Sequence, residues 1–103
     1  MLAEKDILDL QTVLAEKEFC NEMIARAEDE ESKLQQEFDQ LQKRIDLLGV
    51  IDRRRSNDHT RGNLELVVEK RTDLARKLSA QKANVQGYRE ILEVVEAIEK
   101  ELA

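Results

Sequence analysis

The sequence predicts an all-α protein in which two long helices fold back on each other as an antiparallel coiled-coil hairpin. Its 103 residues include no proline and three glycines, so little interrupts a helix. Apolar residues recur at alternating spacings of three and four in two long series, and one polar stretch separates the series. Sandwiches and barrels, which need frequent turns, do not fit this composition.

The first apolar series predicts a helix over about residues 3–52. Steps of three and four residues place its members on one stripe of an α-helix, which forms the seam of a left-handed coiled coil. Lys17 and Glu31 are its polar members. The series comprises Leu10, Val13, Lys17, Cys20, Ile24, Ala27, Glu31, Leu34, Phe38, Leu41, Ile45 and Leu48.

The second apolar series predicts a helix over about residues 63–103 by the same reasoning. Its polar members are Arg71, Gln81 and Glu99. The series comprises Leu64, Val67, Arg71, Leu74, Leu78, Gln81, Val85, Tyr88, Leu92, Val95, Glu99 and Leu102.

Residues from about 53 to 62 are predicted to form the turn between the helices. Ser56, Asn57 and Asp58 are typical of turns and helix caps, and Gly62 or Asn63 is a candidate start for the second helix. The seam is lost over the longer stretch from Gly49 to Asn63, which is long for a connection between helices, so we expect the flanking helices to extend into it and only a few residues to form the true turn. The chain then forms a single helical-hairpin domain over residues 1–103.

A hairpin register centred on Ser56 pairs apolar members of the two series in successive layers. The same register places Glu31 opposite Gln81, so that two polar residues share one layer and fix the register. Examples of the predicted pairs are Leu48 with Leu64, Leu41 with Arg71, Ala27 with Val85, Cys20 with Leu92 and Leu10 with Leu102. The alternative is an extended dimer in which helices of two chains pair and the hairpin does not close.

Near the chain ends the apolar stripe is wider than a two-stranded seam requires, whereas toward the turn it narrows to the seam residues. A wide apolar arc favours packing against further helices. We therefore expect a homodimer or higher oligomer with a four-helix bundle at the terminal end. The additional residues, which form the predicted oligomer interface, are Ile7, Leu8, Leu14, Phe19, Met23, Ile91, Val94 and Ile98.

Charge is distributed unevenly along the chain. Residues 43–71 hold eight basic and five acidic residues, so they carry +3, while the whole chain carries −6. Arginine recognises carboxylates and phosphates in two-pronged contacts. The predicted partner-binding residues are Arg53, Arg54, Arg55 and Arg61. A solvated turn without a partner is the alternative, because Asp52 and Asp58 flank the three consecutive arginines.

No residue pattern indicates catalysis, a metal site or a cofactor. Cys20 and His59 are the only nucleophile–base pair, and in a hairpin they lie about 50 Å apart by helix rise. We expect Cys20 to be a small core residue and His59 to lie on the surface. Metal-ligand spacings are absent, and the three glycines cannot form a phosphate-binding loop. The chain is therefore not expected to be an enzyme.

The sequence favours a cytoplasmic protein without a membrane segment. Residues 1–10 lack the basic start and apolar run of a signal peptide, and no stretch approaches the ~20 apolar residues of a membrane helix. The predicted function is that of a coiled-coil spacer, scaffold or adaptor, a protein-binding module that binds itself and an unidentified protein. The alternative is RNA or DNA phosphate binding through the arginines, which the pI of about 4.9 disfavours. Catalysis at an oligomer interface is a third hypothesis, with no residue in its favour.

Overall fold

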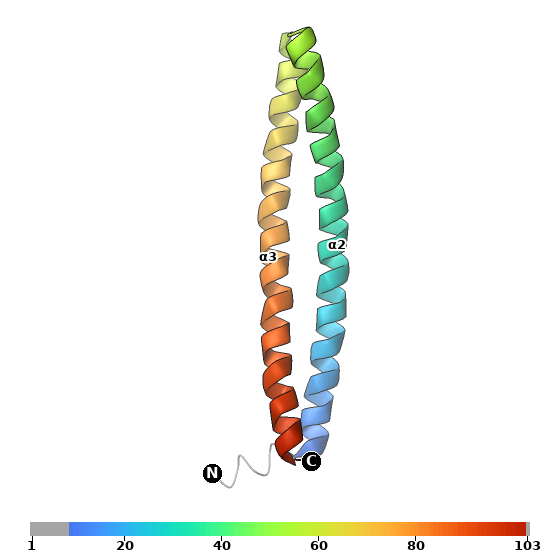
Figure 1. Cartoon of the computed structure of the whole chain (residues 1–103), viewed down its shortest axis with the longest axis vertical. Helices are drawn as coiled ribbons and strands as arrows, with labels where there is room; N and C mark the ends of the chain where they lie inside the picture. The colour runs from blue at the N-terminus through green and yellow to red at the C-terminus, as the bar shows by residue number, and fades with distance from the viewer. Residues whose placement is uncertain (1–8, 103) are drawn as a thin grey trace. The chain divides into compact units, whose positions relative to one another are not determined.

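A computed structural model describes residues 9–102, in which nearly every residue is helical. Helix α2 spans Leu10–Arg54 and helix α3 spans Asp58–Leu102, with 45 residues each. Residues 55–57 join the helices, and the described residues contain no strand (Figure 1). The prediction of two long helices in an all-α hairpin is confirmed. Neither described helix contains an apolar stretch that could cross a bilayer.

Each helix begins with a side chain that accepts a hydrogen bond from the first turn. Asp9 Oδ1 accepts from the backbone N–H of Thr12 at 2.7 Å, and this bond lowers the pKa of the Asp9 carboxyl. Asn57 Oδ1 accepts from the backbone N–H of Thr60 at 2.8 Å. These bonds satisfy N–H groups that have no partner within a helix, so they fix where α2 and α3 start.

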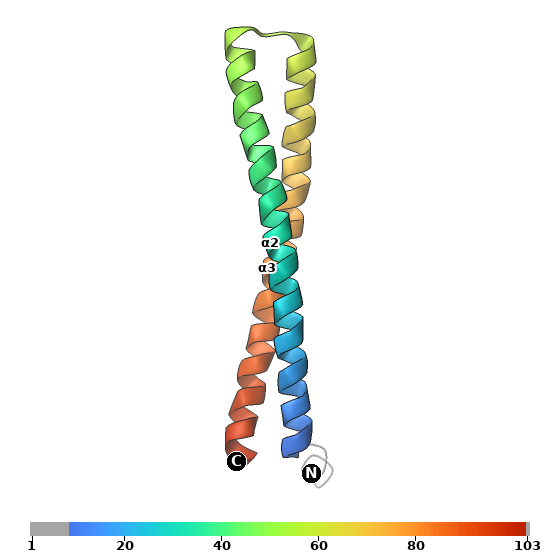
Figure 2. The ribbon, with the colours of Figure 1, turned by 90° about the vertical axis from the view of Figure 1, so that its right-hand side faces the viewer.

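The turn is shorter than the predicted range of residues 53–62. Helix α2 continues to Arg54 and α3 begins at Asp58, so only residues 55–57 lie between the two helices (Figure 2). The Asn57 cap starts the second helix five residues earlier than expected, and Gly62 lies inside α3, where it costs only about 1 kcal/mol relative to alanine. The predicted start of the first helix, at residue 3, lies outside the described residues.

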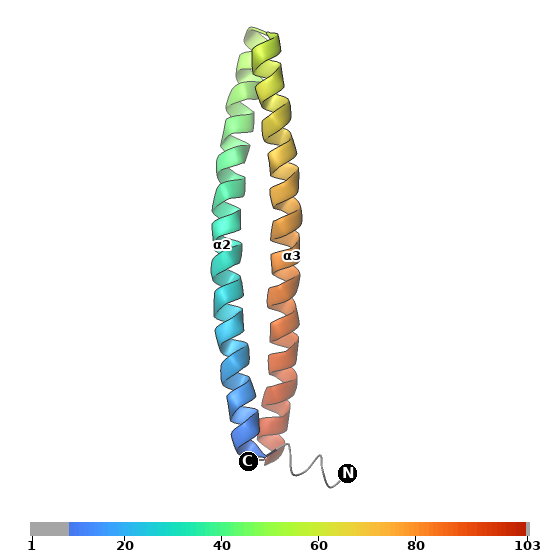
Figure 3. The ribbon, with the colours of Figure 1, turned by 180° about the vertical axis from the view of Figure 1, so that it is seen from behind.

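Contacts along the chain divide it into two units. We call Met1–Asp29 with Lys82–Ala103 the terminal unit, and Glu30–Gln81 the turn unit. Within the described part of each unit, α2 and α3 run antiparallel and side by side, as Figures 1 and 3 both show. The boundary falls next to Glu31 and Gln81, which are half-buried. Their pairing in one polar layer and the single domain over residues 1–103 both stay predictions.

The predicted seam forms the interface between the helices in both units. All members of the two series are buried or half-buried except the outermost pair, Leu10 and Leu102, which are 41% and 42% exposed. Over residues 9–102 no further layer covers that pair, because Leu10 begins α2 and Leu102 ends α3. The buried apolar residues among those described are Val13, Cys20, Ala27, Val67, Leu78 and Val85.

Polar side chains on the seam bond across to the other helix. Lys17 Nζ lies 3.1 Å and 3.3 Å from the two carboxylate oxygens of Glu99. Arg71 Nη1 donates to Gln42 Oε1 at 2.8 Å. Gln42 follows Leu41, the residue predicted to face Arg71, so this contact agrees with the register centred on Ser56.

Candidate interaction surfaces

The two flanks of the seam differ in chemistry. When the seam residues are assigned to heptad positions a and d, positions e lie on one flank, whereas positions g, with positions c beyond them, lie on the other. In the terminal unit Arg89 Nη2 lies 2.6 Å from Glu28 Oε1, and both residues are at e. The e positions of the two helices therefore meet on one side of the helix pair. Their g positions share the opposite side.

Five apolar residues gather on that opposite side of the terminal unit, and we call them the terminal apolar surface. Phe19, Ile91 and Val94 are 51%, 50% and 60% exposed, and Met23 and Ile98 are half-buried beside them. Met23, Ile91 and Ile98 occupy g positions, and Phe19 and Val94 occupy c positions. Side chains that reach outward from c are not covered by a two-helix seam, so this surface extends beyond what the hairpin itself buries.

The structure places the predicted oligomer-interface residues in more than one location. Five of them form the terminal apolar surface, but Leu14 lies at an e position on the other flank, where it is 47% exposed. Ile7 and Leu8 lie outside the described residues. The contact of these residues with another chain stays a prediction.

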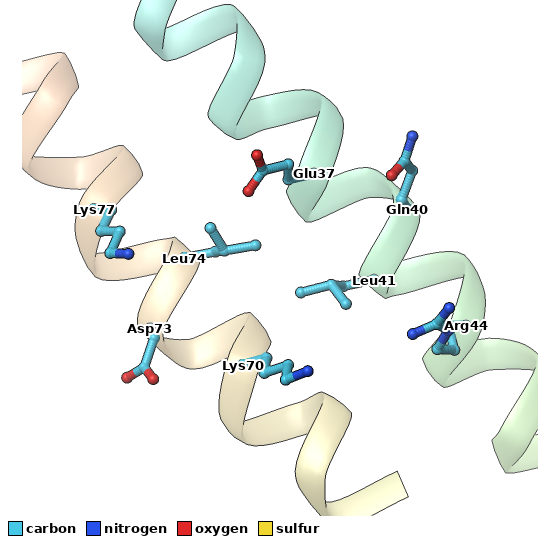
Figure 4. A pocket seen from close by; sticks show the side chains of 8 residues that line it. All are labelled: Glu37, Gln40, Leu41, Arg44, Lys70, Asp73, Leu74 and Lys77. Atoms are coloured by element: carbon cyan, nitrogen blue, oxygen red, sulfur yellow. The ribbon is translucent and has the colours of Figure 1, made fainter. Parts of the chain in front are cut away.

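In the turn unit a groove of about 420 Å³ lies between the helices on the flank of the g positions. Figure 4 shows Leu41 of α2 and Leu74 of α3 pointing toward each other across this groove. Arg44, Lys70 and Lys77 at g positions border the groove together with two carboxylates, so an apolar floor is combined with a small excess of positive charge. Its lining residues are Glu37, Gln40, Leu41, Arg44, Lys70, Asp73, Leu74 and Lys77.

Apolar residues toward the turn extend this flank, contrary to the expected narrowing of the stripe. Leu47 and Leu66, both at c positions, are 62% and 57% exposed, and Ile51 at a g position is 39% exposed. We call the groove together with these three residues the turn-unit surface. The sequence carries a signal for it: in the run Leu47–Ile51 the c and g positions are apolar, which the single-seam interpretation overlooked.

The predicted partner-binding arginines fall into two groups. Arg53, Arg54 and Arg55 are exposed where α2 ends. Arg61 instead takes part in a network within the turn: its Nε lies 3.9 Å from Asp52, and its Nη2 donates to Ser56 Oγ. Ser56 Oγ in turn donates to Asp52 Oδ1 at 3.2 Å. Arg61 is therefore bonded within the turn although its side chain is 58% exposed, whereas Arg53, Arg54 and Arg55 supply three consecutive exposed charges. The contact of all four arginines with a partner stays a prediction.

Cys20 and His59 belong to different units, and their environments match the expected core and surface roles. Cys20 is 1% exposed, and burial together with the negative charge of Glu16 raises the pKa of its thiol. A buried thiol with a raised pKa is a poor nucleophile. His59 is exposed, and its Nε2 lies 3.3 Å from Asn63 Nδ2. Over residues 9–102 no group of three or more acidic, histidine or cysteine side chains is placed to hold a metal ion.

Comparison with known proteins adds no family to these observations: no family model, no curated protein and no solved structure matches the chain.

Proposed function

We propose that the chain is a non-enzymatic protein–protein interaction module that self-associates through the terminal apolar surface and presents Arg53–Arg55 to a partner. The observation that carries this proposal is the large apolar area left exposed on the helices. Among the described residues, six apolar side chains are buried, whereas ten large ones are exposed.

The energetics of burial favour association through the terminal apolar surface. Complete burial of a side chain such as Phe or Ile contributes about 1.5–3 kcal/mol. Phe19, Ile91 and Val94 each retain half or more of their exposure in the isolated chain, so a covering helix adds a substantial part of this value at each residue. Contiguous apolar surfaces of this kind are typical of sites that bind other proteins.

The arginines support a second contact of different chemistry. Arg53, Arg54 and Arg55 are consecutive and exposed, and guanidinium groups pair well with carboxylates. Asp52 is already bonded to Ser56 and lies near Arg61, so it does not depend on these three arginines for a partner. An acidic protein surface fits this segment.

Self-association is tested by the mass of the purified chain in size-exclusion chromatography with light scattering. We expect a mass near twice 12.0 kDa for the wild type and a shift toward one chain for Phe19→Glu and Ile91→Glu. Ala15→Glu and Ala97→Glu are the matched controls, because they add the same charge at exposed positions of the same helices. A monomeric wild type, or a dimer that tolerates both surface variants, contradicts the proposal.

A further inference from the structure

We propose that the terminal apolar surface docks on the turn-unit surface of a second copy of the chain. This inference rests on the proposed self-association and names the surface that receives the terminal unit. Both surfaces lie on the g and c flank of their own helix pair, and both expose large apolar side chains, among them Phe19 and Ile91 on one and Leu47 and Leu66 on the other.

Charge complementarity selects this pairing over the contact of two terminal units. Residues of the terminal unit sum to −7 and those of the turn unit to +1. On the g and c positions themselves, the described residues of the terminal unit carry −2. These charged residues are Asp9, Glu16, Arg26 and Glu101.

The corresponding positions of the turn unit carry +2, which matches the terminal flank in size and opposes it in sign. These charged residues are Glu30, Lys33, Glu37, Arg44, Arg54, Lys70, Asp73 and Lys77. Two terminal surfaces in contact would bring like charges together, whereas a terminal surface on a turn-unit surface brings opposite charges together.

The groove gives the second copy a specific place to bind. Its apolar floor of Leu41 and Leu74 fits an apolar side chain that projects from a c position, as Phe19 and Val94 do. Arg44 and Lys70 border the floor, where they can meet acidic neighbours of the entering side chain. Because every copy carries both surfaces, two copies can make the contact reciprocally, as in a twofold-symmetric dimer.

The first test removes positive charge from the turn-unit surface of the full chain. We expect Arg44→Glu with Lys70→Glu to weaken self-association by about tenfold or more in sedimentation equilibrium, because it places like charges in the contact. Lys43→Glu with Arg76→Glu makes the same charge change at exposed f positions and is expected to leave the association unchanged. Circular dichroism of each variant checks that the helices are retained.

The second test restores the contact by mixing two defective variants. Glu16→Lys with Glu101→Lys makes the terminal surface basic and weakens self-association on its own. Mixed with the Arg44→Glu, Lys70→Glu chain, it forms pairs in which opposite charges meet at both contacts, so we expect a mixed dimer near wild-type affinity. Glu18→Lys with Glu93→Lys, at exposed b positions, is the control and gives no such rescue.

The salt dependence of self-association distinguishes a contact between unlike surfaces from a contact between two terminal surfaces in the wild type. Added salt screens attraction between opposite charges, so the proposed dimer weakens as the salt concentration rises. A dimer that strengthens with salt and tolerates Arg44→Glu with Lys70→Glu joins two terminal surfaces. That result overturns this inference and leaves the proposed self-association intact, whereas a monomeric wild type overturns both.

Discussion

The ion pair between Lys17 and Glu99 gives the sharpest test of how the two helices pair in the terminal unit. Lys17 Nζ lies 3.1 Å from Glu99 Oε1, and the two side chains are 32% and 23% exposed. The residues are separated by 82 positions in the sequence, so their interaction exists only when α2 and α3 lie side by side. A double-mutant cycle with Lys17→Met and Glu99→Leu isolates their coupling in the free energy of unfolding.

The size of the coupling follows from the distance and the partial burial. Unit charges at this separation attract by about 1 kcal/mol in water and several times that in a less polar environment. Ordering of both side chains and contact with solvent reduce the net value, so we expect a coupling of about 1 kcal/mol. The double variant is expected to be about 1–3 kcal/mol more stable than the wild type, because it replaces two polar residues on the seam with apolar ones.

Urea unfolding followed by circular dichroism measures the free energy of unfolding of the wild type, the two single variants and the double variant. Each is measured at two protein concentrations so that self-association is accounted for. Asp73 and Arg76 provide the control pair, since they are 4.0 Å apart, lie within one helix turn and are 65% and 79% exposed. Their coupling should stay below about 0.5 kcal/mol. A coupling for Lys17 and Glu99 no larger than that of the control would refute the close contact of these two side chains across the helices.

Four further predictions concern Gly87, the Asn57 cap, the Cys20 thiol and Arg53–Arg55. Nothing lies within 4 Å of a Cβ added at Gly87, so Gly87→Ala should stabilise α3 by about 0.5–1 kcal/mol in thermal unfolding. A destabilised variant would contradict the open space around this position. Asn57→Ala removes the acceptor for the Thr60 N–H and should cost about 1 kcal/mol, with Asn57→Asp retaining most of the stability. The pKa of the Cys20 thiol is raised in the folded chain, so the unfolded thiol ionises first, near its ordinary value of 9.0. The stability of the wild type relative to Cys20→Ala should therefore be constant below that pH and fall above it; a difference that stays flat to pH 11 would contradict the raised pKa. Gel shifts with RNA and DNA should show no salt-sensitive binding, and a shift that is lost on changing Arg53–Arg55 to alanine would instead support the nucleic-acid alternative.

The helices and their seam could be predicted from the sequence because both depend on local periodicity. A residue such as Val13 or Val85 lies on the apolar stripe of its own helix, whatever the helix packs against. The polar stretch around Ser56 marks where the chain reverses, and a register centred there also agrees with the contact between Arg71 and Gln42. The first residue of α3 was harder to predict from the sequence, because several residues near the turn can cap a helix. Only the structure shows that Asn57 is the cap.

The sequence by itself determined an all-α hairpin, its seam, the burial of Cys20 and the uneven distribution of charge. Only the tertiary structure decided which flanks of the two helices share a face, because that depends on α2 and α3 of one chain packing antiparallel through the seam, as the contact between Arg89 and Glu28 shows. The structure thereby places Leu14 on a different flank from Phe19 and Ile91, and it shows that Arg61 bonds to Ser56 within the turn. It also joined Leu41 and Leu74 in one groove, since residues on different helices form a surface only once the helices are packed.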